Sequence, residues 1–544
     1  MKFTVYFLFL IPLFYSCSTK KKVALIVTNA HIYTVNDSSQ VVNTMIIDEG
    51  KIIELGDNLL LKKYDATKIL DVKGQFIYPG FIDAHCHYTG YAMDAYKLKL
   101  FGTQSFDEVI QKLIDFSKSN KRVWIEGTGW DQNDWKNKNF PTKDTLDTLF
   151  PNTPVFLLRV DGHAALLNQK ALDLSGIDNN TKLVGGEIVK KDGKLTGIII
   201  DNAIEIVRKK LPELEKKDAI NYILKAQDEF FELGLTSVVE TGITHQVMEW
   251  MKKLNEEDKL LLKSTFMLMA DDEHFSSYLI SKPYKNKRMH IAGFKVFGDG
   301  ALGSRGAFML DDYSDRHGHK GSMLLSSDSL LKIAQLVYQS KYQLAVHAIG
   351  DAANREVLKI YAKTLLSKND RRWRIEHAQV VDPNDIHLFR DFSIIPSVQP
   401  SHAISDMKWV EDRIEYKRMS GAYAYQNLLQ QNNWLPLGTD FPVENLNPIH
   451  TFYAAVFRKD KDELPQLGFQ LENALTREEA LRGMTIWAAK SVFEEDEKGS
   501  LEKGKAADFV ILSVDLLNAN AKDIYNAKIK STYINGKEVY TRKK

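Results

Sequence analysis

The stretch Ile77-Tyr78-Pro79-Gly80-Phe81-Ile82-Asp83-Ala84-His85-Cys86-His87 decides how the rest of the chain is interpreted. It is a short apolar run, opened by Pro-Gly and closed by a His-x-His pair, as in a buried strand. Side chains of a strand alternate between its faces, so His85 and His87 point the same way and can bind one metal ion. The pair alone is equally consistent with two ordinary histidines beside a turn. The metal interpretation therefore requires further ligands elsewhere in the chain.

Composition restricts the class of protein. The 544 residues include 72 basic and 71 acidic side chains, a net charge of +1. This balance gives no indication of a nucleic-acid partner, and a small molecule is the expected one. The length predicts about two to four domains. A homodimer is possible on these grounds.

The first residues have the composition of a leader. Lys2 is followed by an apolar run to Tyr15, which is too short to span a membrane. Cys17 then precedes a polar, lysine-rich tether, as at a bacterial lipoprotein processing site. We expect residues 1–22 to be a signal peptide and tether, with a lipid on Cys17 as the only membrane contact and a periplasm-facing location in the cell envelope. The alternative is an ordinary cleaved leader with an incidental cysteine.

Both ends of the mature chain carry short β-rich runs. Residues 23–78 alternate such runs with turns, and residues 495–544 contain Asn535-Gly536 between two more, a strong hairpin signal. Neither piece is long enough for a stable sheet alone. The economical prediction is one small β-sandwich built from both ends.

The middle of the chain, residues 79–494, alternates buried-type strands with helical stretches. This alternation in a chain of this length predicts an α/β fold, a (β/α)8 TIM-like barrel. Ten strands are expected, about two of them in insertions, and one insertion is expected at about 161–197. The expected strands are 81–85, 123–126, 155–160, 237–240, 265–269, 293–297, 344–348, 374–377, 394–398 and 435–439.

Ionisable residues recur where these strands end. In a barrel, the carboxyl ends of all strands open onto one face, where catalytic groups lie. Apolar strands seldom carry unpaired ionisable groups, which are costly to bury. The convergence of several such residues therefore favours a site over a set of unrelated core pairs. Besides the histidine pair, they are Glu240, Lys295, His347, His377 and Asp440.

An ordered series of motifs resembles the amidohydrolase superfamily, and within it the amidohydrolase-3 group of deformylase-like hydrolases. The resemblance covers nearly the whole mature chain and implies a metal-dependent hydrolase barrel with a β-sandwich from both termini. The motifs are the opening stretch, Asp161-Gly162-His163, residues 295–306 (KVFGDGALGSRG), His347-Ala348-Ile349-Gly350-Asp351, Glu376-His377-Ala378, Ser397-Val398-Gln399-Pro400, residues 438–442 (GTDFP) and residues 504–508 (GKAAD).

The resemblance implies a role for each ligand. His85, His87 and Asp440 would hold one metal, His347 and His377 a second, and a carboxylated Lys295 would bridge them. Glu240 competes with Lys295 for the bridge. Two Zn²⁺ ions are expected, although manganese, iron, cobalt and nickel suit the same donors. Metal-activated hydroxide would attack, with Asp440 as general base and then acid.

The substrate side is assigned more loosely. Arg159 and His163 flank a predicted strand end, and His402 lies just past Gln399-Pro400. Trp130 and Trp135 belong to a loop that is expected to form an aromatic wall. Together these features predict hydrolysis of a non-peptide carbon–nitrogen bond, in an amide or an N-formyl or N-acyl amine. The alternatives are a single-metal deaminase of the same superfamily and a non-catalytic binding lipoprotein.

Overall fold

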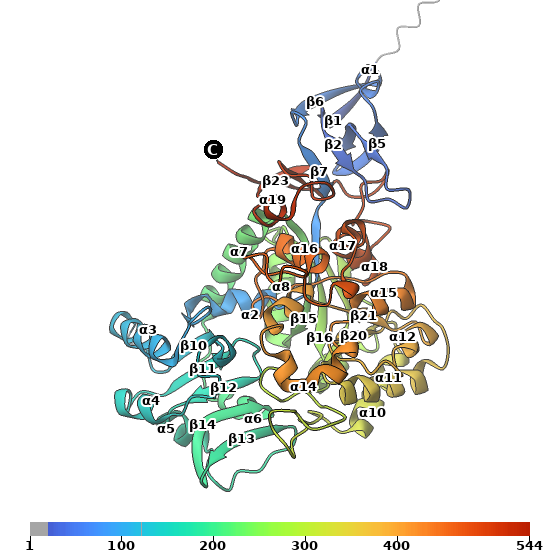
Figure 1. Cartoon of the computed structure of the whole chain (residues 1–544). Helices are drawn as coiled ribbons and strands as arrows, with labels where there is room; N and C mark the ends of the chain where they lie inside the picture. Colours follow the sequence, from blue (N-terminus) through green and yellow to red (C-terminus); the bar gives the residue numbers. More distant parts are fainter. Residues whose placement is uncertain (1–19, 121, 544) are drawn as a thin grey trace, which may run out of the picture.

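The computed structural model describes residues 20–120 and 122–543. The predicted signal peptide up to residue 19, with Cys17, lies outside these residues. Figure 1 shows a small β-sandwich at one end, a barrel in the middle and a third α/β unit beside it. No helix among the described residues is long and apolar enough to cross a bilayer.

The β-sandwich contains both ends of the described chain. One sheet has the order β5 (Lys51–Gly56), β4 (Thr44–Asp48), β1 (Lys21–Thr28) and β6 (Tyr64–Asp71). Short helix α1 (Leu60–Lys63) precedes β6. The other sheet has the order β24 (Lys537–Thr541), β23 (Ile529–Ile534), β22 (Phe509–Leu512), β7 (Phe76–Pro79), β2 (His31–Tyr33) and β3 (Val41–Val42).

Apolar side chains of both sheets form the core of this sandwich. Val27 and Met45 from the first sheet pack with Ile77 and Phe509 from the second, and all four are buried. The antiparallel pairing of β7 with β22 joins the two ends of the chain directly. The predicted sandwich from both termini is therefore confirmed.

The barrel sheet follows the sandwich without a linker. Gly80 separates β7 from the first barrel strand, and a Cβ there would lie 2.2 Å from Thr236 Oγ1, so only glycine fits. Parallel strands run in the order β21 (Ile395–Ser397), β20 (Arg374–His377), β19 (Gln343–Ala348), β18 (Met289–Phe297), β16 (Lys263–Met269), β15 (Leu235–Ile243) and β8 (Phe81–Cys86). Two-residue β17 (Lys285–Asn286) pairs with β18 at the edge. The predicted α/β barrel is confirmed.

The eighth position of the barrel is not a regular strand, contrary to the prediction for residues 435–439. Leu437 makes only an isolated parallel bridge with Val398. The segment still closes the barrel, because Ala84 N–H donates to Leu437 O at 3.1 Å and Gly438 N–H donates to Val398 O at 3.0 Å. Pro436 lacks an N–H group, which interrupts the ladder of a regular strand.

Helices surround the barrel sheet, and apolar side chains of α7, α8, α10 and α11 share its core. Several begin at the expected caps: Ser326 accepts from Ser329 N at the start of α10, and Thr476 and Glu479 form a capping box at α17. The helices of this part are α2 (Tyr88–Met93), α7 (Lys216–Glu232), α8 (His245–Glu256), α9 (Asp272–Tyr278), α10 (Ser327–Tyr338), α11 (Asp351–Leu365), α12 (His387–Asp391), α13 (Pro400–Asp406), α14 (Val410–Arg418), α15 (Tyr425–Asn432), α16 (Pro448–Phe457), α17 (Arg477–Gly483) and α18 (Ile486–Lys490). Helix α19 (Ala521–Tyr525) lies between β22 and β23.

The insertion is larger than the expected 161–197. Its sheet has the order β13 (Gly186–Lys191), β14 (Lys194–Asp201), β12 (Ala164–Leu167), β11 (Val155–Arg159), β10 (Ile125–Trp130) and β9 (Leu98–Lys99). The expected strands 123–126 and 155–160 lie here, outside the barrel. Two apolar clusters pack against this sheet with α3 (Phe106–Ser119), α4 (Asp144–Leu149), α5 (Gln169–Ser175) and α6 (Asn202–Arg208). A sheet of its own therefore makes the insertion a compact unit.

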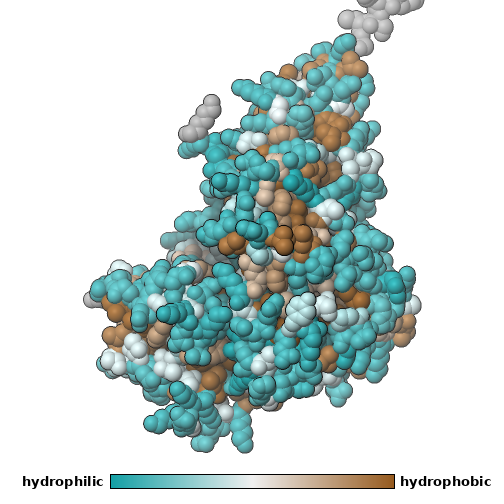
Figure 2. Space-filling model, in the orientation of Figure 1, coloured by the Kyte–Doolittle hydropathy of each residue, from teal (hydrophilic) through white to brown (hydrophobic). Residues whose placement is uncertain are grey.

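The surface in the view of Figure 2 is mostly hydrophilic, and hydrophobic residues gather in small patches between the sandwich and the middle of the barrel. Scattered apolar patches of this kind are normal on globular proteins.

Candidate metal centre

His85 and His87 lie at the carboxyl end of β8. His85 is fully buried, and His87 caps helix α2 and is partly exposed. Their rings are perpendicular, with centroids 5.5 Å apart. Cys86 points to the opposite side of the strand, where its Sγ lies 3.5 Å from Val239 O, and burial raises the pKa of this thiol. The strand thus presents two imidazoles to one side and keeps the thiol out of reach.

Asp440 meets both histidines from the irregular eighth segment. Its Oδ1 lies 3.3 Å from His85 Nε2 and 3.2 Å from His87 Nε2. The backbone helps to place it, since Asp440 N–H donates to His85 O at 2.8 Å. Asp440 has φ +65° and His377 has φ +75°, in the left-handed region that residues other than glycine adopt less often.

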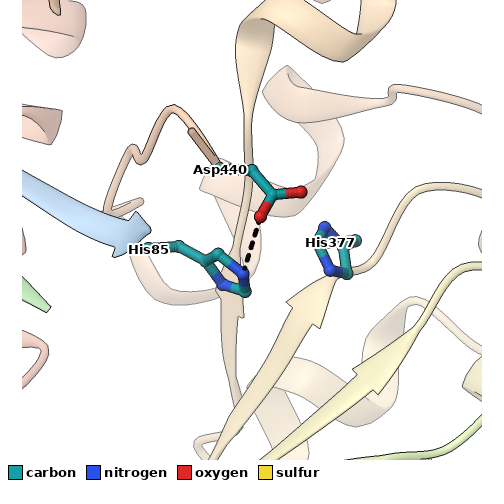
Figure 3. Close-up of side chains that lie close together, drawn as sticks. All are labelled: His85, His377 and Asp440. Carbon is teal, nitrogen blue, oxygen red and sulfur yellow. Dashed lines mark ion pairs between the residues drawn. The ribbon is translucent and has the colours of Figure 1, made fainter. Parts of the chain in front are cut away.

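The histidines of β19 and β20 face the same point. The ring centroids of His347 and His377 are 4.5 Å apart, and those of His85 and His377 are 4.8 Å apart. One ligand atom each from His85, His377 and Asp440 lie within 4.8 Å of one another. Figure 3 shows these three side chains close together. Burial lowers the pKa of His347 and of His377 well below the ordinary value, so both rings are neutral, the form that binds metals.

Lys295 on β18 completes the set. It is fully buried, burial lowers its pKa to about 8, and its Nζ has no hydrogen-bond partner among the described residues. His85 Nε2 and Asp440 Oδ1 are also buried without a geometrically acceptable hydrogen bond. Orphaned polar atoms of this kind are costly and rare. Nitrogen and carboxylate donors left free around one point fit a divalent metal centre.

Glu240, the rival for the bridging position, is engaged elsewhere. Its two carboxylate oxygens accept from Thr89 N and Thr89 Oγ1, both at 3.0 Å, at the start of α2. It is buried, and burial raises its pKa to about 7. Glu240 therefore anchors the helix that follows His87, while Lys295 keeps a free terminal nitrogen.

Two residues missed as site residues in the sequence hold the ligands from behind. Glu376 Oε2 lies 2.5 Å from His85 Nδ1, and Gln399 Oε1 lies 2.7 Å from His377 Nδ1. Burial opposes ionisation of Glu376, but the Arg374 guanidinium outweighs it and holds the pKa of that carboxyl below its ordinary value. The strand-end pattern that revealed the ligands also contained Glu376, directly before His377.

Two of the three substrate-side candidates reach the centre. His402 stacks on His377 with centroids 5.7 Å apart, and its Nε2 lies 3.4 Å from Asp440 Oδ2. His163 comes from the insertion, where its Nδ1 pairs with Asp201 Oδ1 at 2.7 Å, and its ring lies 5.1 Å from that of His347. The insertion thus contributes a side chain beside the barrel ligands.

The third candidate, Arg159, is already bonded within the insertion, and the expected aromatic wall is wrong. Arg159 is buried, with its guanidinium bound to Gln132, Asp131 and Asp161, so these neighbours already use its charge. Trp130 and Trp135 are buried in the core of the insertion and form no exposed aromatic wall. The apolar area of two indoles favours a packed core over a solvent-facing loop.

Comparison with known proteins agrees with this geometry. The sequence model of the Amidohydrolase family matches residues 68–540. The chain is 31% identical over 540 residues to Protein LONG AFTER FAR-RED 3 of Arabidopsis thaliana, covering 95% of this chain and 91% of the relative. It is 24% identical to an N-substituted formamide deformylase of Arthrobacter pascens, covering 95% and 98%.

A solved structure agrees in both fold and sequence. An uncharacterised metal-dependent hydrolase from Pyrococcus horikoshii OT3 superposes with a TM-score of 0.75 at 30% identity, covering 91% of this chain and 99% of that one. This chain belongs to the amidohydrolase family, a family of metal-dependent hydrolases.

Proposed function

We propose that the protein hydrolyses a carbon–nitrogen bond other than a peptide bond, in an amide or an N-formyl or N-acyl amine. The observation that carries the proposal is the buried, unpartnered Lys295 nitrogen among neutral histidines and Asp440. The deformylase relative, which matches along nearly its whole length, supports the choice of bond.

The residues divide into two metal positions in this proposal. His85, His87 and Asp440 would hold one ion, His347 and His377 the other, and Lys295 would serve both as a carbamate. A pKa of about 8 leaves part of Lys295 as the neutral amine that adds CO₂. Zn²⁺ is the first choice for these donors. Bound divalent metals polarise a carbonyl oxygen and lower the pKa of water.

The proton path in this proposal uses Asp440 and His402. Asp440 accepts the proton of the attacking water and returns it to the leaving nitrogen. Burial opposes protonation of His402, but the Asp440 carboxylate outweighs it and raises the pKa of His402 to about 9. A charged His402 beside Asp440 Oδ2 then orients that carboxylate. His163, at the other side of His347, is placed to bind the carbonyl or amine portion of a small molecule.

A single-metal deaminase is the second candidate. The closeness of His85, His377 and Asp440 favours it, since one ion could contact all three. A non-catalytic binding lipoprotein is less well supported, because no ligand of the set is missing. We also propose that Cys17 carries a lipid and that the enzyme faces the periplasm, on the basis of the leader composition.

Metal analysis and a substrate screen test the proposal together. Purified protein is analysed for bound metals and then incubated with N-formyl and N-acyl amines, with formate, carboxylate and amine release measured. Nucleobases and triazines form the comparison set, with ammonia release measured. Cleavage of an amide supports the proposal. Ammonia release without cleavage of any amide decides for the deaminase.

A further inference from the structure

The two metal positions differ in what lies behind their histidines. A metal-binding histidine usually donates its second ring nitrogen to a neighbour, which sets the tautomer and the basicity of the ligating nitrogen. A carboxylate in this role makes the ring a stronger donor than a neutral amide or carbonyl does, because it stabilises positive charge on the imidazole.

Behind His85 this neighbour is charged. Glu376 Oε2 accepts from His85 Nδ1, which leaves Nε2 free on the side of Asp440. Arg374 donates to Glu376 Oε1 at 2.6 Å and Oε2 at 2.9 Å, and to Ala84 O at 2.7 Å. Both residues of this ion pair are fully buried. The carboxylate therefore stays ionised and fixed in place.

Behind His377 the neighbour is a neutral amide, and behind His347 it is a backbone carbonyl, with the Asp299 carboxylate slightly farther away. Gln399 Nε2 donates to Ser397 O at 3.1 Å, which directs its Oε1 towards His377 Nδ1. His347 Nε2 lies 3.3 Å from the carbonyl of Gly300. Asp299 lies 3.5 Å from the same nitrogen, but its carboxylate accepts three backbone N–H groups, from Phe308, Ile349 and Gly350. Most of its accepting capacity is therefore used by the backbone.

We infer that Glu376 and Gln399 are positioning residues that give the centre two unequal metal affinities, tight at His85–His87–Asp440 and weak at His347–His377. The inference rests on the proposed function, since it assumes that metals bind there. At limiting metal the protein would hold one ion, and at excess metal two.

Stepwise Zn²⁺ titration of the full chain tests this inference. Protein stripped with a chelator is titrated against a competing chromophoric chelator, and the number of bound ions is measured by mass spectrometry. The wild type should show two dissociation constants at least about tenfold apart. Removal of an outer hydrogen-bond partner typically weakens metal binding about 10- to 100-fold.

Two opposite variants separate the two positions. Glu376→Gln is combined with Arg374→Met, so that no buried arginine is left without its carboxylate. This variant should weaken the first step about 10- to 100-fold and leave the second unchanged. Gln399→Glu should strengthen binding of the second Zn²⁺ ion and so bring the two dissociation constants closer together. Circular dichroism verifies that each variant is folded.

Gln379→Glu is the matched control. It adds the same charge nearby, at a side chain that bonds to Asp406 and Tyr423 and not to a ligand ring. The inference is supported if the two dissociation constants move closer together in Gln399→Glu but not in Gln379→Glu. Equal affinities in the wild type, or equal narrowing in both variants, would overturn it. A wild type that binds no Zn²⁺ at all would overturn the proposed function itself.

Discussion

Replacement of Lys295 by methionine should make the metal-free protein more stable and the enzyme inactive. Lys295 is fully buried, and its ammonium has no hydrogen-bond partner among the described residues; it lies 4.9 Å from the centroid of the Phe297 ring. Methionine keeps the length of the side chain and removes the charge. In the proposed function, Lys295 therefore destabilises the folded protein until metal and CO₂ bind.

The size of this cost follows from the pKa. A fall from 10.5 to about 8 corresponds to a penalty of about 3 kcal/mol for the charged folded form. Below pH 8 the lysine is charged in both the folded and the unfolded chain, so the penalty is fully present. Between pH 8 and 10.5 only the unfolded chain keeps the proton, so stability rises with pH. Above 10.5 the penalty is gone.

Urea unfolding of metal-stripped protein in CO₂-free buffer measures the effect. Transition midpoints are compared, because a protein of several domains need not unfold in one step. Lys295→Met should be more stable than the wild type by about 3 kcal/mol at pH 7, and by less than half of that at pH 9.5. A midpoint at or below that of the wild type at pH 7, or a gain independent of pH, would refute the reasoning.

Lys498→Met is the contrasting control. Lys498 is also buried, but its Nζ pairs with Glu494 at 2.6 Å. Loss of this partner leaves the Glu494 carboxylate with less compensation, so the variant should be destabilised. If Lys295→Met stabilises the protein and Lys498→Met destabilises it, the stability gain comes from the unpaired charge of Lys295.

Other variants test the remaining assignments. His85→Ala with His87→Ala should remove one ion per chain and abolish turnover, and full activity would contradict the ligand assignment. Asp440→Asn should lower kcat about 10²- to 10⁴-fold in a folded protein, measured at saturating metal; a loss below tenfold would exclude its role in proton transfer. Short carboxylic acids should partly restore activity to Lys295→Ala, and no rescue together with normal metal content would move the bridge to Glu240. Cys17→Ala should leave the precursor unprocessed by the lipoprotein route; normal maturation with membrane retention would exclude the lipid.

The positions of the candidate ligands could be predicted because all strands of the barrel follow the same geometry. Each strand ends at the same face, so a polar residue after an apolar run has a known location. His85, Lys295, His347 and His377 lie on β8, β18, β19 and β20 and converge as expected. Asp440 reaches the same face although its segment is not a regular strand, because backbone hydrogen bonds to Ala84 and Val398 hold the segment in the barrel.

Other features have no such local signal. Strands β10 and β11 have the same apolar character as barrel strands, so only the sheet pairing reveals that they belong to the insertion. Glu376 and Gln399 contact His85 and His377 on other strands, and no sequence spacing encodes these contacts. Arg159 looked like a free cation at a strand end, and its partners Asp131 and Gln132 come from a different loop.

The joining of both chain ends in one sandwich has a consequence for synthesis. Tyr78 donates to Asp515, 437 positions further along the chain, and β7 pairs with β22 next to it. On the ribosome, β7 emerges early with β2 as its available partner strand, and its other edge stays unpaired until β22 has been made. Contacts between such distant positions form slowly, and a waiting apolar strand is prone to aggregate. Release of the last fifty residues is therefore the step that ends the exposure of the nascent chain, and chaperone dependence should be concentrated before it.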